Sequence, residues 1–215
     1  LLKIELDGLI RAQKLYTLHW WHNMELAYRH GHKLNEATGD YPSGTYTPEQ
    51  ITAAQIVSRA AVIELEVNNR KHLFIKVAKT VNDALTALAY AELKGLEQYF
   101  ARIKPAGTKI VLFTGPPDQL RLTLDYYYDP LQLSETGARI DGAGNTPVQD
   151  AIREYLQVLK FNGEFTVSDL EDTLQQLPSC AEGEAYVRSA AANYKTPASW
   201  ATITDSYVAN SGYME

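Results

Sequence analysis

The residues best suited to chemistry gather near the start of the chain, in the segment LHWWHNMELAYRHGH at 18–32, which holds four of the five histidines and two adjacent tryptophans. On a helix, His19 and His22 lie one turn apart and could share a zinc ion, whereas His30 would lie roughly 16 Å from His19. No cysteine or carboxylate has the spacing to complete the ligand set. We therefore expect polar-face histidines and no metal site, with a zinc-dependent adaptor as one alternative.

Acidic residues offer a second possible chemistry. A metal-dependent nucleotidyltransferase needs paired carboxylates, typically two acids one residue apart on a strand, but the chain contains no Asp-x-Asp. Asp125 and Asp129 would share one side of an extended strand at a separation of roughly 13 Å, which is too far for two-metal catalysis. We expect a solvent-facing strand residue and a turn-starting residue, and no enzyme. A nucleotidyltransferase-like, metal-dependent enzyme is the alternative function.

Other catalytic and cofactor signatures are missing from the sequence. It contains no Gly-x-Ser-x-Gly elbow, no Walker-type glycine loop and no dinucleotide-binding fingerprint. Cys180 follows Pro-Ser without the local signature of a nucleophile, and a single cysteine excludes an internal disulfide. We expect no cofactor.

The composition indicates a globular protein that binds other proteins. The formal net charge of −6 and the pI near 5.4 disfavour nucleic-acid binding, and no apolar run is long enough to cross a membrane. Hydrophobic residues make up 45% of the chain, enough for one sizeable core or two small ones. Fourteen tyrosines and three tryptophans favour a protein-protein contact role, because aromatic residues with a polar tip are enriched at such interfaces.

Periodicity and turn residues predict the elements of the first half. Apolar residues at helical spacing indicate the helices, alternation indicates the strands, Thr47-Pro48 with Gln50 resembles a capping box, and Asn68-Asn69 suits a two-residue turn. The predicted elements are a helix at 6–30 that stops at Gly31, a short helix from 48, strands at 63–67 and 73–77, a helix at 86–103, and a second hairpin at 108–128 with GPPD as its turn.

The second half begins with a glycine-rich loop at 134–146, which we expect to project or to make contacts. Thr146 and Pro147 are typical of a helix start, and Asn162-Gly163 predicts a tight turn with positive backbone dihedrals. The remaining predicted elements are a short helix ended by Pro178 and strands near 184–192 and 201–209.

This element order predicts an α+β fold: an N-terminal helix followed by two small helix-on-sheet units, ββαββ and then ααββ. The predicted domains are an N-terminal interaction helix and linker at 1–47, an α+β domain with two hairpins at 48–128, and a C-terminal α+β wedge-like domain at 129–215.

Three stretches of the sequence resemble a known family. They are LRLTLDYYYDPLQLSETGARIDG, TPVQDAIREYLQVLKFNGEFTVSDLEDTLQQLP and ITDSYVANSGYM. Together they resemble the baseplate J-like wedge proteins of bacteriophage tails, in the version found in phages and prophages of Bacteroidetes. The matching positions are Asp129, Pro130, Leu131, Pro147, Val148, Ala151, Ile152, Phe161, Asn162, Gly163, Gly212 and Tyr213. The family usually has Gly-Val and a strand after the second helix, where this chain has Pro178-Ser179-Cys180.

The resemblance implies a structural component of a phage or phage-like contractile tail. Such a protein would assemble with copies of itself and with baseplate, tube or sheath proteins, in a virion tail baseplate made in the bacterial cytoplasm. The aromatic face of the 18–32 helix would pack on the body of the protein or on a neighbouring subunit. The candidate interface residues are Trp20, Trp21, Tyr28, Tyr127 and Arg139.

Overall fold

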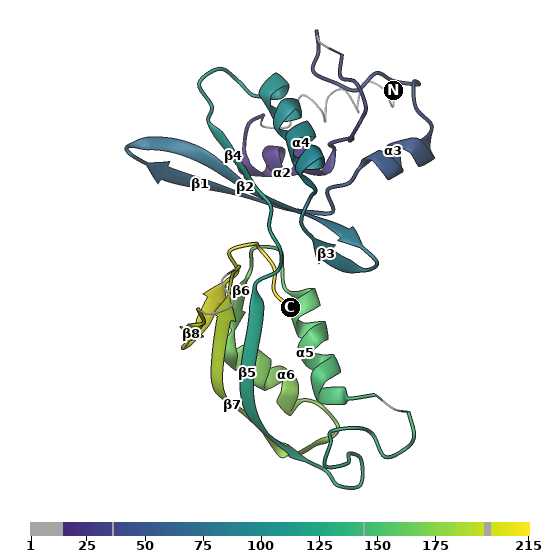
Figure 1. Ribbon diagram of the computed structural model, residues 1–215, viewed down its shortest axis with the longest axis vertical. Helices are drawn as coiled ribbons and strands as arrows, with labels where there is room; N and C mark the ends of the chain where they lie inside the picture. Colours follow the sequence, from purple (N-terminus) through teal and green to yellow (C-terminus); the bar gives the residue numbers. More distant parts are fainter. Residues whose placement is uncertain (1–14, 36, 144, 196–198) are drawn as a thin grey trace, which may run out of the picture. The chain divides into compact units, whose positions relative to one another are not determined.

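Two units of mixed α+β structure make up the protein, Leu1–Gly115 and Pro116–Glu215 (Figure 1). The computed structural model describes residues 15–35, 37–143, 145–195 and 199–215. Each unit combines a small sheet with helices on one of its faces, which agrees with the α+β class and the helix-on-sheet layout that the sequence predicts.

Unit 1 is built on the long strand β2. Its elements are α2 (Leu18–Leu26), α3 (Pro48–Ala54), β1 (Arg59–Val67), β2 (Arg70–Val81), β3 (Ala84–Thr86), α4 (Tyr90–Ile103) and β4 (Ile110–Phe113). β1 and β3 pair antiparallel with β2, and β4 pairs parallel with it. The turn between β1 and β2 consists of Asn68 and Asn69, whose φ angles of 51° and 58° suit a two-residue hairpin turn. The first predicted hairpin is confirmed.

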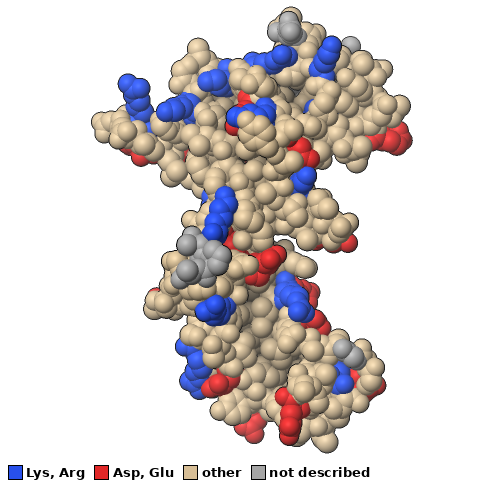
Figure 2. Space-filling view, in the orientation of Figure 1, with Lys and Arg blue, Asp and Glu red and all other residues tan. Residues whose placement is uncertain are grey.

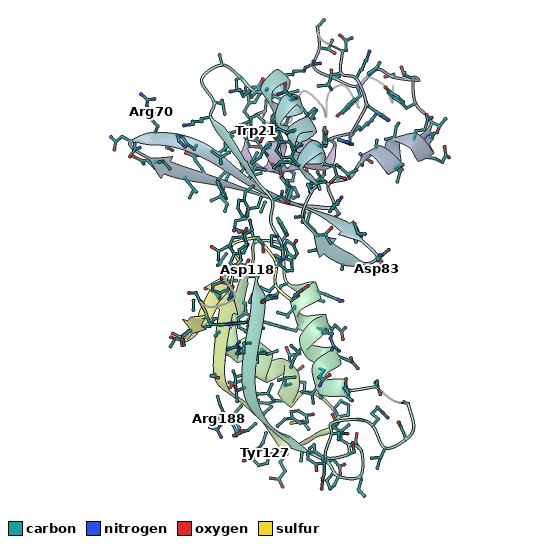
Figure 3. All side chains as sticks on the ribbon, in the orientation of Figure 1. Trp21, Arg70, Asp83, Asp118, Tyr127 and Arg188 are labelled. Carbon is teal, nitrogen blue, oxygen red and sulfur yellow. The ribbon has the colours of Figure 1, made fainter. Side chains whose placement is uncertain are left out.

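The core of unit 1 lies between one face of this sheet and the helices α2 and α4. Trp21 from α2 is buried there (Figure 3), and its ring centroid lies 5.7 Å from that of the buried Phe100 of α4. Gly95, in the middle of α4, makes room for Tyr28, because a Cβ at position 95 would lie 2.3 Å from the Tyr28 hydroxyl. A helix-interior glycine costs about 1 kcal/mol relative to alanine, so this close approach has a price in helix stability.

Unit 2 is a second sheet with two helices on one face. Its elements are β5 (Gln119–Tyr128), α5 (Pro147–Val158), β6 (Glu164–Thr166), α6 (Val167–Gln175), β7 (Cys180–Asn193), β8 (Ala201–Ile203) and β9 (Ser206–Val208). The strand order is β5-β7-β8, all antiparallel, and β6 pairs with β9. The strictly alternating burial of β5 directs Leu122 and Leu124 towards the helices and leaves the other face exposed.

The predicted hairpin at 108–128 is wrong. β4 pairs with β2, and β5 pairs with β7, so the two strands of the expected hairpin belong to different units. The GPPD segment joins the units instead of forming a turn, and its Asp118 is held by the C-terminal segment. The division therefore falls after Gly115 and not after 128. Residues 1–47 are not a separate domain either, since Trp21 and Tyr28 belong to the core of unit 1.

Within the described residues, the helix predicted at 6–30 covers only Leu18–Leu26. α2 begins behind Thr17, whose side chain accepts the Trp20 N–H at 3.1 Å, and it ends at Leu26 rather than at Gly31. The chain leaves the helix because Tyr28 turns into the core and the His30 N–H donates to the carbonyl of Ala54 at 2.8 Å. Residues 6–14 of this prediction lie outside the described residues.

Helix starts are reproduced in part. The capping box of Thr47 and Gln50 is present in full. Pro147 stands in the first turn of α5 as predicted, but the Thr146 hydroxyl donates to Gln149 Oε1 at 3.3 Å instead of capping the helix. Thr146 has a ψ of 86°, outside the extended conformation of the capping residues Thr17 and Thr47, and its side chain makes no capping hydrogen bond.

The turn at Asn162-Gly163 has a positive φ only at Asn162, at 59°. Gly163 is needed for another reason: a Cβ there would lie 2.7 Å from the Lys160 carbonyl oxygen. We expect Gly163→Val to destabilise the protein by about 1 to 3 kcal/mol, because backbone must shift to admit the side chain. Urea denaturation followed by circular dichroism measures the effect, and an unchanged midpoint would contradict the contact.

Candidate functional site

The aromatic part of segment 18–32 packs on the body of the protein. Trp21 and Tyr28 are buried, and the Tyr28 ring lies 5.4 Å from that of Tyr99 on α4. Assigning these two residues to an interface is therefore wrong, because the α4 side chains already cover them. Trp20 is only partly buried and packs edge-on against Trp21, with 4.8 Å between the ring centroids.

The histidines of this segment are spread over different environments. His19 is exposed and shares a hydrogen bond with the Asn23 side chain at 3.3 Å, whereas His22 is half-buried. Within the described ranges, no group of three or more His, Cys, Asp and Glu side chains is placed to hold a metal ion. The structure thus gives the zinc-dependent adaptor no ligand set in the part of the chain that it describes.

The two acids considered for catalysis each have a structural partner. Asp125 Oδ2 accepts a hydrogen bond from Arg188 Nε at 2.6 Å on the exposed face of the β5–β7 pair. Asp129 Oδ1 accepts the Leu131 N–H at 2.9 Å, and its Oδ2 accepts from the Gln132 side chain at 3.1 Å. The first acid supports a strand pair and the second closes a turn, as the sequence predicts, so the structure does not join them into a metal-binding pair.

Cys180 stands at the start of β7 and is half-buried. Burial raises the pKa of its thiol above the ordinary value, and the hydrogen bond with Tyr126 lowers it by less. Because the thiolate is the nucleophilic form, a raised pKa makes this cysteine less reactive at neutral pH.

The loop between β5 and α5 is folded. Its backbone bonds include Ser134 N–H to the Ala138 carbonyl at 2.9 Å and Ile140 N–H to the Gln132 carbonyl at 3.1 Å. Leu133 is buried and anchors the loop to the body of unit 2. These bonds show that the loop has a defined fold of its own; its role as a contact-making loop stays a prediction.

Apolar side chains project from this folded loop. Leu131 is 81% exposed and Ile140 is 55% exposed, while Tyr127, on the outer face at the end of β5, is 50% exposed (Figure 3). We call these three residues the loop tip. Single exposed apolar residues are common, but three of them in β5 and the folded loop that follows it are candidates for a contact site.

Arg139 lies beside Ile140 in this loop and donates from Nε to Asp141 Oδ2 at 2.8 Å. The ion pair is exposed on both sides, so it contributes little to stability, but it fixes the direction of the arginine. Sequence reasoning selected Tyr127 and Arg139 and missed Leu131 and Ile140. The signal in the sequence was an apolar residue on each side of the turn-rich stretch 132–139. These two residues are far apart in the chain, and only the folding of the loop brings their backbone together.

The outer edge of β5 is open along most of its length. Its first residues are covered by the C-terminal segment, since Asp118 N–H donates to the Tyr213 carbonyl at 3.0 Å and Leu120 N–H donates to the Glu215 carbonyl at 2.9 Å. From Arg121 to Tyr128, the described part of the chain supplies no strand on that side. An open edge presents backbone donors and acceptors to which another chain can add a strand.

No known protein-family model matches the chain, and no curated protein is significantly similar to it in sequence. Among the described residues, no helix has the length and apolar character required to span a bilayer. The loop tip and the open β5 edge are therefore the features from which a function can be inferred.

Proposed function

We propose that the protein is a structural component of the baseplate of a phage tail or a phage-like contractile tail. In this function it assembles with copies of itself and with neighbouring baseplate, tube or sheath proteins, within the virion tail. The observation that carries the proposal is the loop tip beside the open edge of β5: a folded, apolar projection next to unpaired backbone groups is suited to holding a partner protein, not a small substrate.

The residues that resemble the tail family support this proposal by where they lie. Asp129 opens the loop that carries the tip, through its bond to the Leu131 N–H. The Phe-Asn-Gly and Gly-Tyr motifs meet, since the Asn162 N–H donates to the Gly212 carbonyl at 2.6 Å and the Phe161 and Tyr213 rings stack at 6.0 Å. These contacts fasten unit 2 around the C-terminal segment, a role that suits a scaffold.

A partner protein could use two kinds of contact with this surface at the same time. A partner strand along β5 would satisfy backbone groups, while Leu131 and Ile140 would enter an apolar pocket on the partner and fix the position along the strand. Burying two exposed aliphatic side chains contributes roughly 1.5 to 3 kcal/mol each. Removing both is therefore expected to weaken the contact by a factor of at least about 100.

The test compares two double variants in cells that produce the tail particles. Leu131→Ser/Ile140→Ser removes the two aliphatic side chains of the loop tip. The matched control is Val158→Ser/Val208→Ser, because these valines are also exposed but lie at the end of α5 and on β9. We expect the tip variant to be at least about tenfold depleted from purified particles with an unchanged melting temperature, and the control to be incorporated normally. Equal incorporation of both variants would contradict a role for the tip.

A further inference from the structure

A pocket of about 370 Å³ in unit 1 is lined by basic residues. It lies between the loop that follows α2 and the middle of α4. The charged and titratable bases around it are Arg29, His30, His32, Lys33 and Arg102. No Asp or Glu is among its lining residues. Because the walls of such a pocket are concave and partly apolar, the positive potential of its basic residues is concentrated there and attracts a bound anion strongly.

Arg29 is fixed in this pocket by aromatic contacts. Its guanidinium carbon lies 4.7 Å from the centre of the Tyr41 ring, and its backbone N–H donates to the Tyr41 hydroxyl at 2.8 Å. Tyr41 in turn stacks on Tyr99 of α4, with 6.0 Å between the centroids. The buried Nε of Arg29 has no hydrogen-bond partner. A guanidinium that is held in place by aromatic rings presents its donors in a fixed direction, which suits the binding of an oxyanion.

Three other basic residues of the pocket, His32, Lys33 and Arg102, are also without acidic partners among the described residues. His32 is stacked on Tyr46 at 3.6 Å, and its buried Nδ1 has no hydrogen-bond partner. Lys33 and Arg102 are exposed, and neither forms an ion pair with any described residue.

Two acidic residues lie near this pocket, and neither forms an ion pair with its Lys or Arg residues. The Glu92 carboxylate on α4 binds Lys79, at 2.8 and 2.9 Å. Asp40 lines the neighbouring hollow together with Arg102 but makes no ion pair with it. Glu92 also faces His30, so the charges that remain available for a ligand are those of Arg29, Lys33 and Arg102.

The charge of the chain points to the source of the anion. Residues 1–115 contain 14 Lys and Arg against 11 Asp and Glu, whereas residues 116–215 contain 6 against 15. On the face shown in Figure 2, Lys and Arg gather around α4 in unit 1. A basic unit and a strongly acidic unit on one chain are complementary between copies, so that unit 1 of one copy attracts unit 2 of the next.

We propose that the pocket around Arg29 binds the carboxylate of an Asp or Glu side chain from unit 2 of a second copy of the chain. The guanidinium fork of Arg29 would take the two carboxylate oxygens, and Lys33 and Arg102 would stand at the rim. Such a contact joins unlike surfaces head to tail and builds rings or filaments. It deepens the assembly function proposed above by naming the surfaces through which copies meet.

Sedimentation velocity of the purified full chain tests this pairing. We expect self-association at about 50 mM NaCl that weakens at least about tenfold at 500 mM, because exposed charges are screened. Lys33→Gln/Arg102→Gln changes two exposed rim residues and should weaken association at least about tenfold at low salt. The control Arg70→Gln/Lys109→Gln removes the same charge outside the pocket and should stay within about twofold of wild type.

Four results would overturn the proposal. One is a rim variant that associates like wild type, and another is equal weakening by the control, which would indicate net charge alone. The third is a monomeric wild type whose melting temperature inorganic phosphate raises saturably, while the rim variant does not respond, which would assign the pocket to free phosphate. A monomeric wild type that still enters tail particles would refute the pocket contact and leave the assembly function intact.

Discussion

Asp118→Ala lowers the free energy of unfolding of unit 2 by about 4 kcal/mol, the largest effect that we expect from a single substitution. The Asp118 carboxylate is fully buried and accepts five hydrogen bonds. The donors are Tyr207 Oη at 2.6 Å, the backbone N–H groups of Asn210 and Ser211, Asn210 Nδ2, and Ser211 Oγ at 2.7 Å. Alanine leaves the buried Ser211 N–H without an acceptor and removes all the side-chain bonds by which position 118 holds residues 207–211.

The pH dependence of this effect has a defined sign. Burial alone would raise the pKa of Asp118, but the hydrogen bonds from Tyr207 and Ser211 outweigh it and hold the pKa below the ordinary value of 3.8. A lowered folded-state pKa stabilises the protein above the unfolded-state pKa, and that contribution is lost as the pH falls through the folded-state value. The loss of unfolding free energy caused by Asp118→Ala should therefore reach its full size at pH 7 and become smaller below about pH 4.

Chemical denaturation of the variant at both pH values measures this prediction. Asp205→Ala is the matched control, because Asp205 is exposed in the same C-terminal region and its side chain has no hydrogen bond in the described structure. We expect the control to stay within about 0.5 kcal/mol of wild type. A deficit of Asp118→Ala no larger than that of the control would show that the carboxylate does not hold the segment.

Glu25→Gln raises stability at neutral pH by about 3 kcal/mol, the second large effect. Glu25 is fully buried on α2, and neither carboxylate oxygen has a hydrogen-bond partner. Burial raises the pKa of this side chain from 4.5 to about 9. The folded protein then keeps the proton that the unfolded chain releases, so stability is complete below pH 4.5 and falls as the pH rises towards 9. An uncharged amide of the same shape removes that loss.

The comparison with Glu66→Gln isolates the effect of burial, since Glu66 is exposed on β1 of the same unit. We expect the free energy of unfolding of Glu25→Gln to equal that of wild type near pH 4 and to exceed it by about 3 kcal/mol at pH 7. The free energy of unfolding of Glu66→Gln should equal that of wild type at both pH values. Urea midpoints at the two pH values provide the measurement. If the gap between Glu25→Gln and wild type does not widen with pH, Glu25 titrates normally and has access to solvent.

Local signals in the sequence predicted the local parts of this fold. Asn68-Asn69 specifies its own turn through left-handed backbone angles, and the capping box at Thr47 closes within four residues. The hairpin at 108–128 failed because strand alternation does not reveal the partner. β5 finds β7 more than fifty residues later, and β4 lies parallel to β2 after a helical crossover.

The candidate site divides in the same way. Tyr127 and Arg139, two of the candidate interface residues named from the sequence, are both exposed. Leu131 and Ile140 come together only because Ile140 bonds to Gln132 across the folded loop. Trp21 and Tyr28 show the opposite error, since they were predicted to meet a partner, whereas the α4 surface of unit 1 covers Tyr28 and the Trp21 face of α2. Glu25 follows Trp21 by four residues and therefore lies on the same helical face, where a charged residue is an exception among apolar ones.

The proposed function rests most directly on whether the chain is part of a tail. Gradient-purified particles, from cells in which the chain carries an affinity tag at its natural locus, would be analysed by quantitative mass spectrometry against the tube protein of the same particles. The proposal predicts that the chain is retained through the gradient at a fixed small ratio to the tube protein, and that tail-specific electron microscopy locates the tag at the baseplate. Intact particles that contain no trace of the chain would contradict it.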